Sequence, residues 1–261
     1  MQAEIGIIGG TGVYDPKLLK DAEEVEVNTP YGAPSDTFVV GEMAGRRVAF
    51  LPRHGRKHTI RPTDVNSRAN VYAFKKLGVE RILAVSTVGS LREEFKPGDL
   101  AFVDQFIDRT TRREQSFYTQ GQVCHISVAD PMCPEIRKAF AAAAKAAKIE
   151  AHSTATYVCI EGPRFSTKAE SRLYRDWGAD IVGMTLVPEC VLAREAEICY
   201  ASISMVTDYD CWKDHPVTAE EIVSTMRANI EKVKRIIAET VPKLPKERAC
   251  ECKCALKSAL V

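Results

Sequence analysis

The sequence has little net charge and no long apolar run. Its 36 lysines and arginines stand against 35 aspartates and glutamates, which gives a formal net charge of +1 at pH 7. A basic face for nucleic acid or for an anionic membrane is therefore not indicated, and a small ligand fits better. No apolar stretch approaches the ~20 residues that span a bilayer, and the N-terminus lacks the basic and apolar regions of a signal peptide. We therefore expect a cytoplasmic protein without nucleic-acid or membrane partners.

Low-complexity linkers and internal repeats are also lacking. A chain of 261 residues can form one large α/β domain, and we expect one domain over 1–245 followed by a cysteine-containing tail over 246–261. Apolar, mostly β-branched runs predict strands at 4–8, 36–42, 47–52, 81–86, 100–106, 154–160, 180–184 and 198–207. Helical patterns lie between them at 63–77, 134–148, 167–177, 188–197 and 219–240. This alternation predicts a mostly parallel or mixed central sheet flanked by helices on both faces.

Turn and capping signals mark three element ends. The pair Ala44-Gly45 between two predicted strands indicates a hairpin. Two capping boxes begin at Thr167 and Thr218, each with a glutamate three residues later, and a threonine and glutamate at this spacing satisfy the free amides of a helix start.

The nine cysteines do not form an obvious metal motif. Six are scattered without the paired spacing of a zinc site, and we expect most of them to be small buried side chains: Cys124, Cys133, Cys159, Cys190, Cys199 and Cys211. The other three alternate in Cys250-Glu-Cys252-Lys-Cys254, which places three thiols on one side of an extended segment. A metal would need a fourth ligand from elsewhere, and no histidine follows His215. Disulfides and an exposed reduced tail are the alternatives, and we expect no metal site.

The first predicted strand ends in the glycine-rich turn Gly9-Gly10-Thr11-Gly12. A dinucleotide fingerprint is not matched, because Asp15 occupies the third glycine position read from Gly10 and Pro16 interrupts the following helix. The chain contains no P-loop motif for a nucleoside triphosphate. The turn can instead hold a single anion with its backbone amides and the Thr11 hydroxyl. A plain tight turn is the alternative.

Other predicted strands also end in anion donors, where ligands of α/β sheets gather. The basic run from Arg53 to His58 follows one strand, and arginine donates a bidentate fork to phosphate. Thr87 and Ser90 follow a second strand, and Thr185 follows a third. A solvated basic loop and ordinary strand-end caps are the alternatives, but the repetition favours an anion site.

Carboxyl groups follow the last predicted strand. Asp208 and Asp210 lie at i and i+2 and face the same way. Burial in a dry cleft raises a carboxyl pKa, as a general acid near neutral pH requires. A helix cap plus a surface aspartate is the alternative. Phe165 and Ser166 precede a capped helix, and Phe165 either packs in the core or stacks on a flat ligand.

Seven ordered motifs cover nearly the whole chain to about residue 240: GGTG, PRHG, NSRANVYA, STVGSL, EGPRFST, GMTLVPE and SISMVTDYDCW. In this order they resemble the trimeric branch of the purine nucleoside phosphorylase family, and most closely its members that act on 5′-methylthioadenosine. The resemblance implies a single α/β domain with a central mixed sheet, assembled as a trimer or hexamer. It implies phosphorolysis of 5′-methylthioadenosine to adenine and 5-methylthioribose 1-phosphate in purine and methionine salvage. Phosphate is then a co-substrate, and no cofactor is needed.

The matching positions imply individual roles. The implied phosphate site consists of Thr11, Arg53, His54, Thr87 and Thr185. The implied nucleoside contacts are Met184 at the ribose, Phe165 and Ser166 at the base, and His125 near the 5′ group of the neighbouring subunit. An apolar 5′ pocket would come from Val217, Ala219 and Val223.

The carboxyl pair would act on the purine. Asp208, protonated or sharing a proton, would stabilise negative charge at N7, and a carboxylate at Asp208 or Asp210 can accept from the 6-amino group of adenine. An asparagine at the first position would suit a 6-oxopurine, so aspartate predicts a preference for adenine nucleosides over inosine or guanosine.

Four expectations stay open at this point. The tail resembles the Cys-x-Cys tails of heat-stable relatives, which implies disulfides there and a further pair between Cys133 and Cys199. The substrate can instead be adenosine, inosine or methylthioinosine. A binding module would use the same pocket without catalysis. A nicotinamide oxidoreductase, suggested by the glycine turn, is the most distant alternative.

Overall fold

The computed structural model describes residues 2–10, 12–13, 18–213 and 219–261, and for 219–223 it describes the backbone only. Within these residues the strands form one mixed sheet. They are β1 Ile5–Gly9, β2 Lys20–Val25, β3 Phe38–Met43, β4 Arg46–Pro52, β5 Arg81–Ser90, β6 Leu100–Phe102, β7 Gln105–Arg109, β8 Ala151–His152, β9 Thr156–Ile160, β10 Ile181–Gly183 and β11 Cys199–Asp208.

The strand order is β2-β3-β4-β1-β5-β10-β9-β7, while β11 pairs with β5 and β6, and β8 with β6. The pairs β1–β4, β1–β5 and β5–β11 are parallel, whereas β3–β4 and β5–β10 are antiparallel. The expected mixed sheet is therefore confirmed. The parallel strands β1, β4, β5 and β11 bring their carboxyl ends to one edge.

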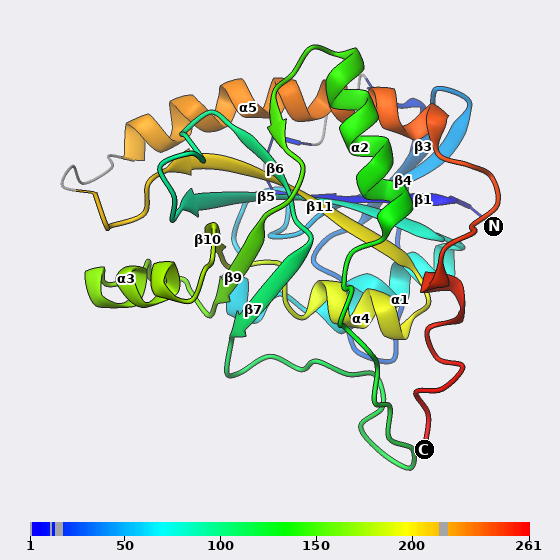
Figure 1. Ribbon diagram of the computed structural model, residues 1–261. Helices are drawn as coiled ribbons and strands as arrows, with labels where there is room; N and C mark the ends of the chain where they lie inside the picture. Colours follow the sequence, from blue (N-terminus) through cyan, green and yellow to red (C-terminus); the bar gives the residue numbers. More distant parts are fainter. Residues whose placement is uncertain (1, 11, 14–17, 214–218) are drawn as a thin grey trace.

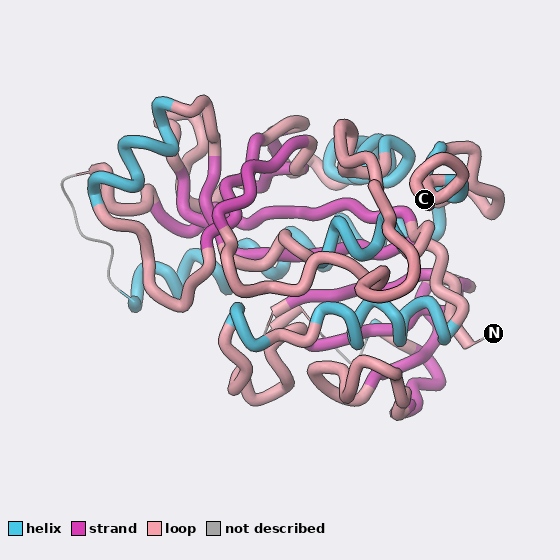
Figure 2. Tube along the Cα trace, turned by 90° about the horizontal axis from the view of Figure 1, so that it is seen from below, coloured by secondary structure: helices cyan, strands magenta, loops and turns pink. Residues whose placement is uncertain are grey.

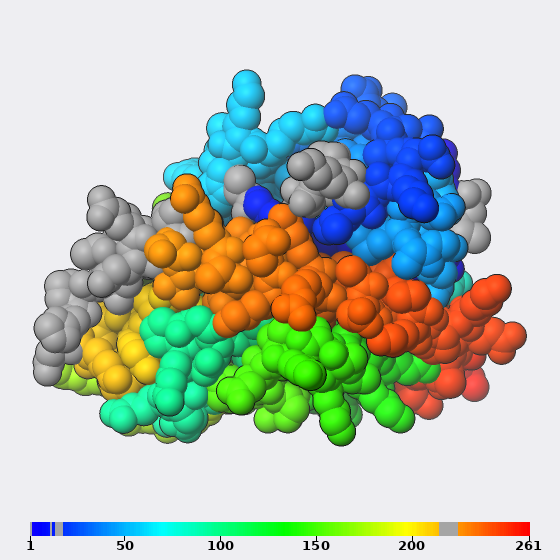
Figure 3. All heavy atoms as spheres, turned by 90° about the horizontal axis from the view of Figure 1, so that it is seen from above, coloured from blue at the N-terminus to red at the C-terminus, as the bar shows by residue number. Residues whose placement is uncertain are grey.

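Helices cover both faces of this sheet (Figure 1). They are α1 Ser67–Leu77, α2 Pro134–Ala146, α3 Lys168–Asp176, α4 Glu189–Glu195 and α5 Ala219–Thr240. Helices α2 and α5 pack together on one face, and Figure 3 shows the surface of α5 (orange) next to that of α2 (green). Helices α1 and α4 pack together on the other face, where Figure 2 shows helices and loops in front of the strands. None of the described helices is long and apolar enough to cross a membrane.

Two apolar cores follow from the alternation of side chains along the strands. In β11, Ile203 and Met205 contribute to the core beneath α2 and α5, whereas Tyr200 and Val206 contribute to the core beneath α1 and α4. Strands buried on both faces need apolar residues at nearly every position, and all of β11 except Asp208 is buried. The polar end of β11 is thus the point at which the strand leaves the core.

Several local expectations are confirmed. Ala44 and Gly45 have φ values of 51° and 80°, as the two central residues of a type I′ hairpin turn between β3 and β4 require. The Thr167 hydroxyl accepts from the Glu170 amide, and the Glu170 carboxylate accepts from the Thr167 amide, which completes the capping box of α3. The second box, at Thr218, lies outside the described residues.

Three local expectations need correction. Strand β2 was not expected, because its sequence KDAEEV contains no apolar run. It is an exposed edge strand, and such strands commonly carry charged residues. The expected strand at 100–106 is two strands that pair with different partners, β6 with β11 and β7 with β9. The cysteine tail is not extended: residues Glu251–Cys254 form a 3₁₀ turn, in which neighbouring side chains point in different directions.

Candidate active site

A cavity of about 490 Å³ lies at the carboxyl edge of the sheet, and this volume suits a small molecule. Its walls come from segments far apart in the sequence: the ends of β1, β4 and β11, the carboxyl-terminal half of β5, and the turns after β9 and β10. The structure brings nine of the expected site residues together here: Arg53, His54, Thr87, Phe165, Ser166, Met184, Thr185, Asp208 and Asp210. Thr11, Val217 and the side chains of Ala219 and Val223 lie outside the described residues.

One end of the cavity carries hydroxyl groups. Thr87 and Thr185 line it from β5 and from the turn after β10. The buried Thr185 hydroxyl makes no hydrogen bond of acceptable geometry within the described part of the chain, although the Thr185 amide donates to the Tyr157 hydroxyl at 3.3 Å. A buried donor without a partner costs free energy unless a ligand supplies one. Glycine at 183 is required for this wall, because a Cβ would collide with the Tyr157 hydroxyl.

Arg53 lies at the same end, but its fork does not face the cavity as expected. Its Nε and Nη2 donate to the two oxygens of Glu189 at 2.7 and 2.8 Å, and its Nη1 donates to the Val85 carbonyl at 2.7 Å. Burial disfavours the charge on Arg53, yet the Glu189 carboxylate more than offsets this and raises the Arg53 pKa. Since Tyr200 also donates to Glu189 at 2.7 Å, Arg53 is held rigidly and offers the cavity a fixed positive charge instead of a free bidentate fork.

His54 is neutral at physiological pH. Burial and the adjacent Arg53 charge lower its pKa to about 4. Its Nδ1 lies 2.9 Å from the Ile60 carbonyl oxygen. Because a carbonyl only accepts, Nδ1 carries the proton and Nε2 is left as an acceptor.

The rest of the basic run divides between two surfaces. His58 lines the cavity beside His54, with their ring centroids 4.7 Å apart. Arg56 instead pairs outside the cavity with Glu24 and Asp36, at 2.6 and 3.1 Å. The run as a whole is therefore not an anion site, and only Arg53, His54 and His58 line the cavity.

The opposite end of the cavity carries the two carboxyl groups. Asp208 accepts hydrogen bonds from the Thr207 hydroxyl and from the Asp210 amide, both at 2.8 Å. Burial is the main cause that raises the pKa of both Asp208 and Asp210, and the neighbouring Asp210 raises that of Asp208 further. Asp210 has a φ of 50°, in the left-handed region. A side chain at Gly89 would press on both residues, since its Cβ would lie 3.0 Å from the Asp208 Oδ1 and 3.3 Å from the Asp210 Cβ.

Apolar side chains form the walls between these two ends. Phe165 is 72% exposed and lines the cavity, so it is not a core residue. Met184, Met205 and Met226 line the wall from the turn after β10, from β11 and from α5. Met226 was not expected from the sequence, although it lies one helical turn after Val223, where a 3.6-residue repeat brings it to a similar face.

Polar contacts behind the Met184 wall hold it in place, and the sequence did not indicate them. The buried Arg113 donates to the carbonyl oxygens of Met184, Val187 and Glu161 at 2.7, 2.6 and 2.6 Å. The Glu161 carboxylate accepts from the Thr111 amide at 2.6 Å and from Arg113 at 3.1 Å. Burial raises the Glu161 pKa, but hydrogen bonds from Thr111, Arg113 and Thr63 more than offset it and lower this pKa to about 2.

His125 does not line the cavity of its own chain. Its amide donates to the Ala259 carbonyl at 2.7 Å, and the adjacent Cys124 forms a β-bridge with Leu260. The segment that carries His125 therefore packs against the C-terminal tail.

Comparison with known proteins gives a consistent result. Residues 4–242 match a family model described as "Phosphorylase superfamily". The S-methyl-5′-thioadenosine phosphorylase of Nitrosopumilus maritimus is 58% identical over 256 residues, which cover 98% of this chain and 97% of that protein.

Solved structures agree with the sequence comparison. A methylthioadenosine phosphorylase from an antarctic soil metagenomic library superimposes with a TM-score of 0.96 at 46% identity, covering 100% of this chain and 93% of the other. A variant of the adenosine/methylthioadenosine phosphorylase of Schistosoma mansoni, solved in complex with methylthioadenosine, superimposes with a TM-score of 0.92 at 40% identity, covering 98% of both chains.

Proposed function

The chain belongs to the phosphorylase superfamily, and from this premise we propose that it cleaves 5′-methylthioadenosine with inorganic phosphate. The products are adenine and 5-methylthioribose 1-phosphate. One observation carries the proposal: a single cavity is lined by anion-binding groups, by two carboxyl groups and by the exposed aromatic ring of Phe165. Phosphate is consumed as the second substrate, and the reaction needs no cofactor.

Phosphate is proposed to bind at the hydroxyl end. Thr87 and Thr185 donate to its oxygens, and the charge of Arg53 attracts it. Because His54 presents an acceptor at Nε2, it receives the hydroxyl hydrogen of a protonated phosphate oxygen instead of donating to the anion. The expected contribution of Thr11 from the glycine turn completes the site.

The purine is proposed to bind at the carboxyl end, where it stacks on Phe165 beside Ser166. Burial raises the pKa of both carboxyl groups, and the charge of Asp210 raises that of Asp208 further, so the site favours keeping a proton on the pair. Asp208 uses this proton to stabilise negative charge at N7, while Asp210 accepts from the 6-amino group of adenine. An enzyme that places a matched acceptor here discriminates against 6-oxopurines, because a mismatch leaves a buried polar group unpaired.

The reaction follows from these two ends. The bond between C1′ and N9 breaks, and its electron pair leaves with the purine, whose charge Asp208 stabilises. The ribosyl group becomes cationic, and the phosphate beneath it first neutralises this charge and then forms the new C1′–O bond. General-acid assistance of this kind contributes roughly 10²–10⁴-fold, and a preorganised anion adds electrostatic stabilisation.

The sugar and its 5′ group are proposed to lie along the methionine wall. Met184 contacts the ribose, and Met205 and Met226 provide soft apolar surface toward a methylthio group. In this pocket a 5′-methylthio group makes apolar contacts, whereas a 5′-hydroxyl finds no polar partner on the methionine wall. It predicts that 5′-methylthioadenosine has a lower KM than adenosine.

The active site is proposed to be shared between subunits of a homotrimer or hexamer. His125 lies outside the cavity of its own chain, on a segment that packs against the tail. This position fits a residue that contributes to the active site of a neighbouring subunit. In this proposal, His125→Ala raises the nucleoside KM while light scattering still reports the wild-type assembly. A monomer with full activity would contradict it.

The catalytic proposal is tested by product analysis with a panel of nucleosides. Adenine release from 5′-methylthioadenosine should require phosphate, and mass spectrometry should identify a methylthioribose phosphate. Faster cleavage of inosine would support a purine nucleoside phosphorylase of broader type, and binding without base release would indicate a binding module. Activity of this kind is consistent with a cytoplasmic role in purine and methionine salvage, which we propose because both products return to these pools.

A further inference from the structure

We propose that the chain binds one structural zinc ion through the thiolates of Cys133, Cys199, Cys250 and Cys252, at the end of the sheet away from the cavity. The proposal replaces the expectation of no metal site and is independent of the proposed catalytic function. It rests on the arrangement of four sulfur atoms that three distant segments bring together.

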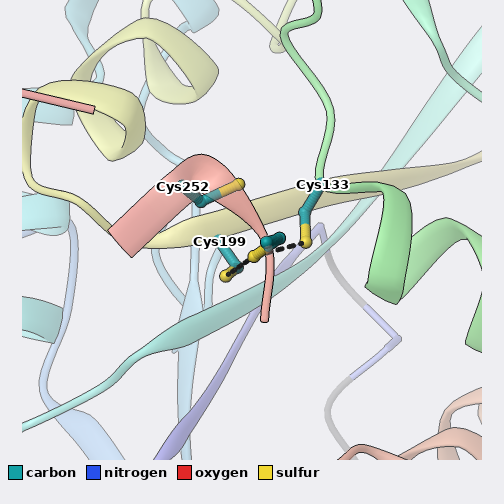
Figure 4. Close-up of side chains that lie close together, drawn as sticks. Cys133, Cys199 and Cys252 are labelled. Carbon is teal, nitrogen blue, oxygen red and sulfur yellow. Dashed lines mark hydrogen bonds between the residues drawn. The ribbon is translucent and has the colours of Figure 1, made fainter. Parts of the chain in front are cut away.

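The four sulfurs lie within 4.8 Å of one another. Cys133 stands directly before α2, Cys199 is the first residue of β11, and the other two belong to the C-terminal tail. The Sγ of Cys250 lies 3.7 Å from that of Cys133 and 3.3 Å from that of Cys199. Figure 4 shows the side chains of Cys133, Cys199 and Cys252 directed from three different segments toward this cluster.

These distances suit a tetrahedral thiolate site. With zinc–sulfur bonds of about 2.3 Å, neighbouring sulfurs of a tetrahedral site lie about 3.8 Å apart. Small shifts of side chains would therefore bring all four sulfurs to one ion. A set of four soft thiolates in this arrangement selects zinc over magnesium or calcium, which prefer oxygen ligands.

The surroundings also fit a closed structural site. The four side chains are buried, with exposures of 0%, 0%, 8% and 3% in sequence order, so no open position is left for a reacting water. Zinc with four thiolates carries a net negative charge, and Arg194 donates from Nη1 to the Cys252 sulfur at 3.6 Å. A cationic donor to a ligand atom is the outer contact that such a site needs.

The cluster also has an entry route. A second cavity of about 440 Å³ reaches Cys252, and Asp104, Asp130 and Glu251 lie on its walls. The same walls carry Arg137 and Arg194, so the three carboxylates leave only a small excess of negative charge to attract a divalent cation. The thiols at the end of the route bind the cation more strongly and release their protons. The fifth cysteine of the neighbourhood, Cys254, is exposed and stands outside the cluster, which makes it a matched control.

A zinc ion here would fasten the tail to the body of the protein. The tail already contacts the body through hydrogen bonds, such as that from the Ala249 amide to Glu135 at 2.8 Å and that from Arg248 to the Glu197 carbonyl at 2.6 Å. Further along, residues of the tail pair with the segment that carries His125. The ion therefore supports the positioning of that segment without contacting the substrate cavity.

The test measures metal in full-length protein purified under reducing conditions without a chelator. We expect about one zinc per chain by elemental analysis, released in equal amount when a mercurial reagent titrates the thiols. Exchange for cobalt should produce the visible bands of a tetrahedral tetrathiolate. Cys254→Ser should retain both signals, whereas Cys252→Ser and Cys133→Ser should lose most of the metal.

The wild-type measurements keep the test decisive even if a cysteine variant folds poorly. Reduced protein that binds neither zinc nor cobalt would overturn the proposal. Peptide mapping that finds these four cysteines joined as disulfides in protein isolated without oxygen would also overturn it. Loss of metal from Cys254→Ser alone would place the site elsewhere and contradict it as well.

Discussion

Strand β11 joins two sites of opposite character. It begins at Cys199 in the thiol cluster and ends at Asp208 in the cavity, and ten residues at the usual strand rise separate these ends by about 30 Å. At the cavity end, polar groups are left incompletely matched: the Thr185 hydroxyl has no partner among the described residues, and the Asp208 and Asp210 pKa values are raised. At the other end, four sulfurs face one another in a buried cluster.

The difference shows how one strand serves two purposes. A site that turns over a substrate needs polar groups whose hydrogen-bond partners are supplied by the ligand. In the free protein these groups are unpaired, which lowers the stability of the fold. A site that fastens a tail needs ligands that face one another permanently. Substitutions at the two ends of β11 should therefore separate activity from stability.

The largest expected effect is on activity at the cavity end. Asp208→Asn replaces the carboxyl proton by an amide N–H, which donates to the base but is too weak an acid to protonate it, so kcat/KM for 5′-methylthioadenosine should fall roughly 10²–10⁴-fold. The ratio of 5′-methylthioadenosine to inosine cleavage should fall with it. Steady-state assays measure both, with the exposed Asp176→Asn as control. A variant that keeps the wild-type ratio would remove Asp208 from the base site.

The next effect concerns the charge pair behind the phosphate end. Glu189→Gln leaves the buried Arg53 charge without its carboxylate, and breaking a buried pair in this way costs about 3–5 kcal/mol of unfolding free energy. The KM for phosphate should rise more than that for the nucleoside, because Arg53 loses its orientation. Urea unfolding and two-substrate kinetics measure these effects. Equal changes in both KM values would indicate a general loss of structure instead.

A smaller effect is expected at the thiol end, and it should appear in stability with little change in kcat. Cys252→Ser, or removal of bound metal by a chelator, should lower the Tm by several degrees, corresponding to about 2 kcal/mol. The kcat should stay within about twofold of wild type, since the cluster lies far from the cavity. Calorimetry of wild type, Cys252→Ser and Cys254→Ser makes the comparison. A large drop in kcat with an unchanged Tm would break the distinction between the two ends.

The smallest effect is a dependence of stability on acid. The folded pKa of Glu161 is about 2, below its ordinary value of 4.5. The stability that its carboxylate contributes is therefore fully present above pH ~4.5 and is lost as the pH falls toward ~2. Urea midpoints measured from neutral pH to pH 3 should fall less steeply for Glu161→Gln than for wild type. Identical slopes would mean that Glu161 does not contribute.

The sequence is informative where chemistry is local. Apolar runs located most strands, and the Thr167 capping box located the start of α3. Polar residues after strands identified six residues of the cavity: Arg53, His54, Thr87, Thr185, Asp208 and Asp210. The resemblance to a known family assigned roles to these residues, and the family comparison supports it.

What the sequence does not reveal depends on pairing across the fold. Nothing near Arg53 in the sequence shows that Glu189 would occupy its fork, because α4 approaches β4 only in the folded chain. The cysteines present the same problem: the spacing of the tail offers three thiols and no fourth ligand. Cys133 and Cys199 meet Cys250 and Cys252 only in the folded chain, where the tail packs against the body.

The central claim is that one cavity holds phosphate and purine at its two ends, and a crystal structure with sulfate and adenine tests it most directly. Sulfate stands for phosphate and should lie within hydrogen-bond distance of Thr87 and Thr185. Adenine should stack on Phe165 with N7 facing Asp208 and its amino group facing Asp210. Sulfate and adenine in two separate cavities, or adenine away from both aspartates, would contradict the claim.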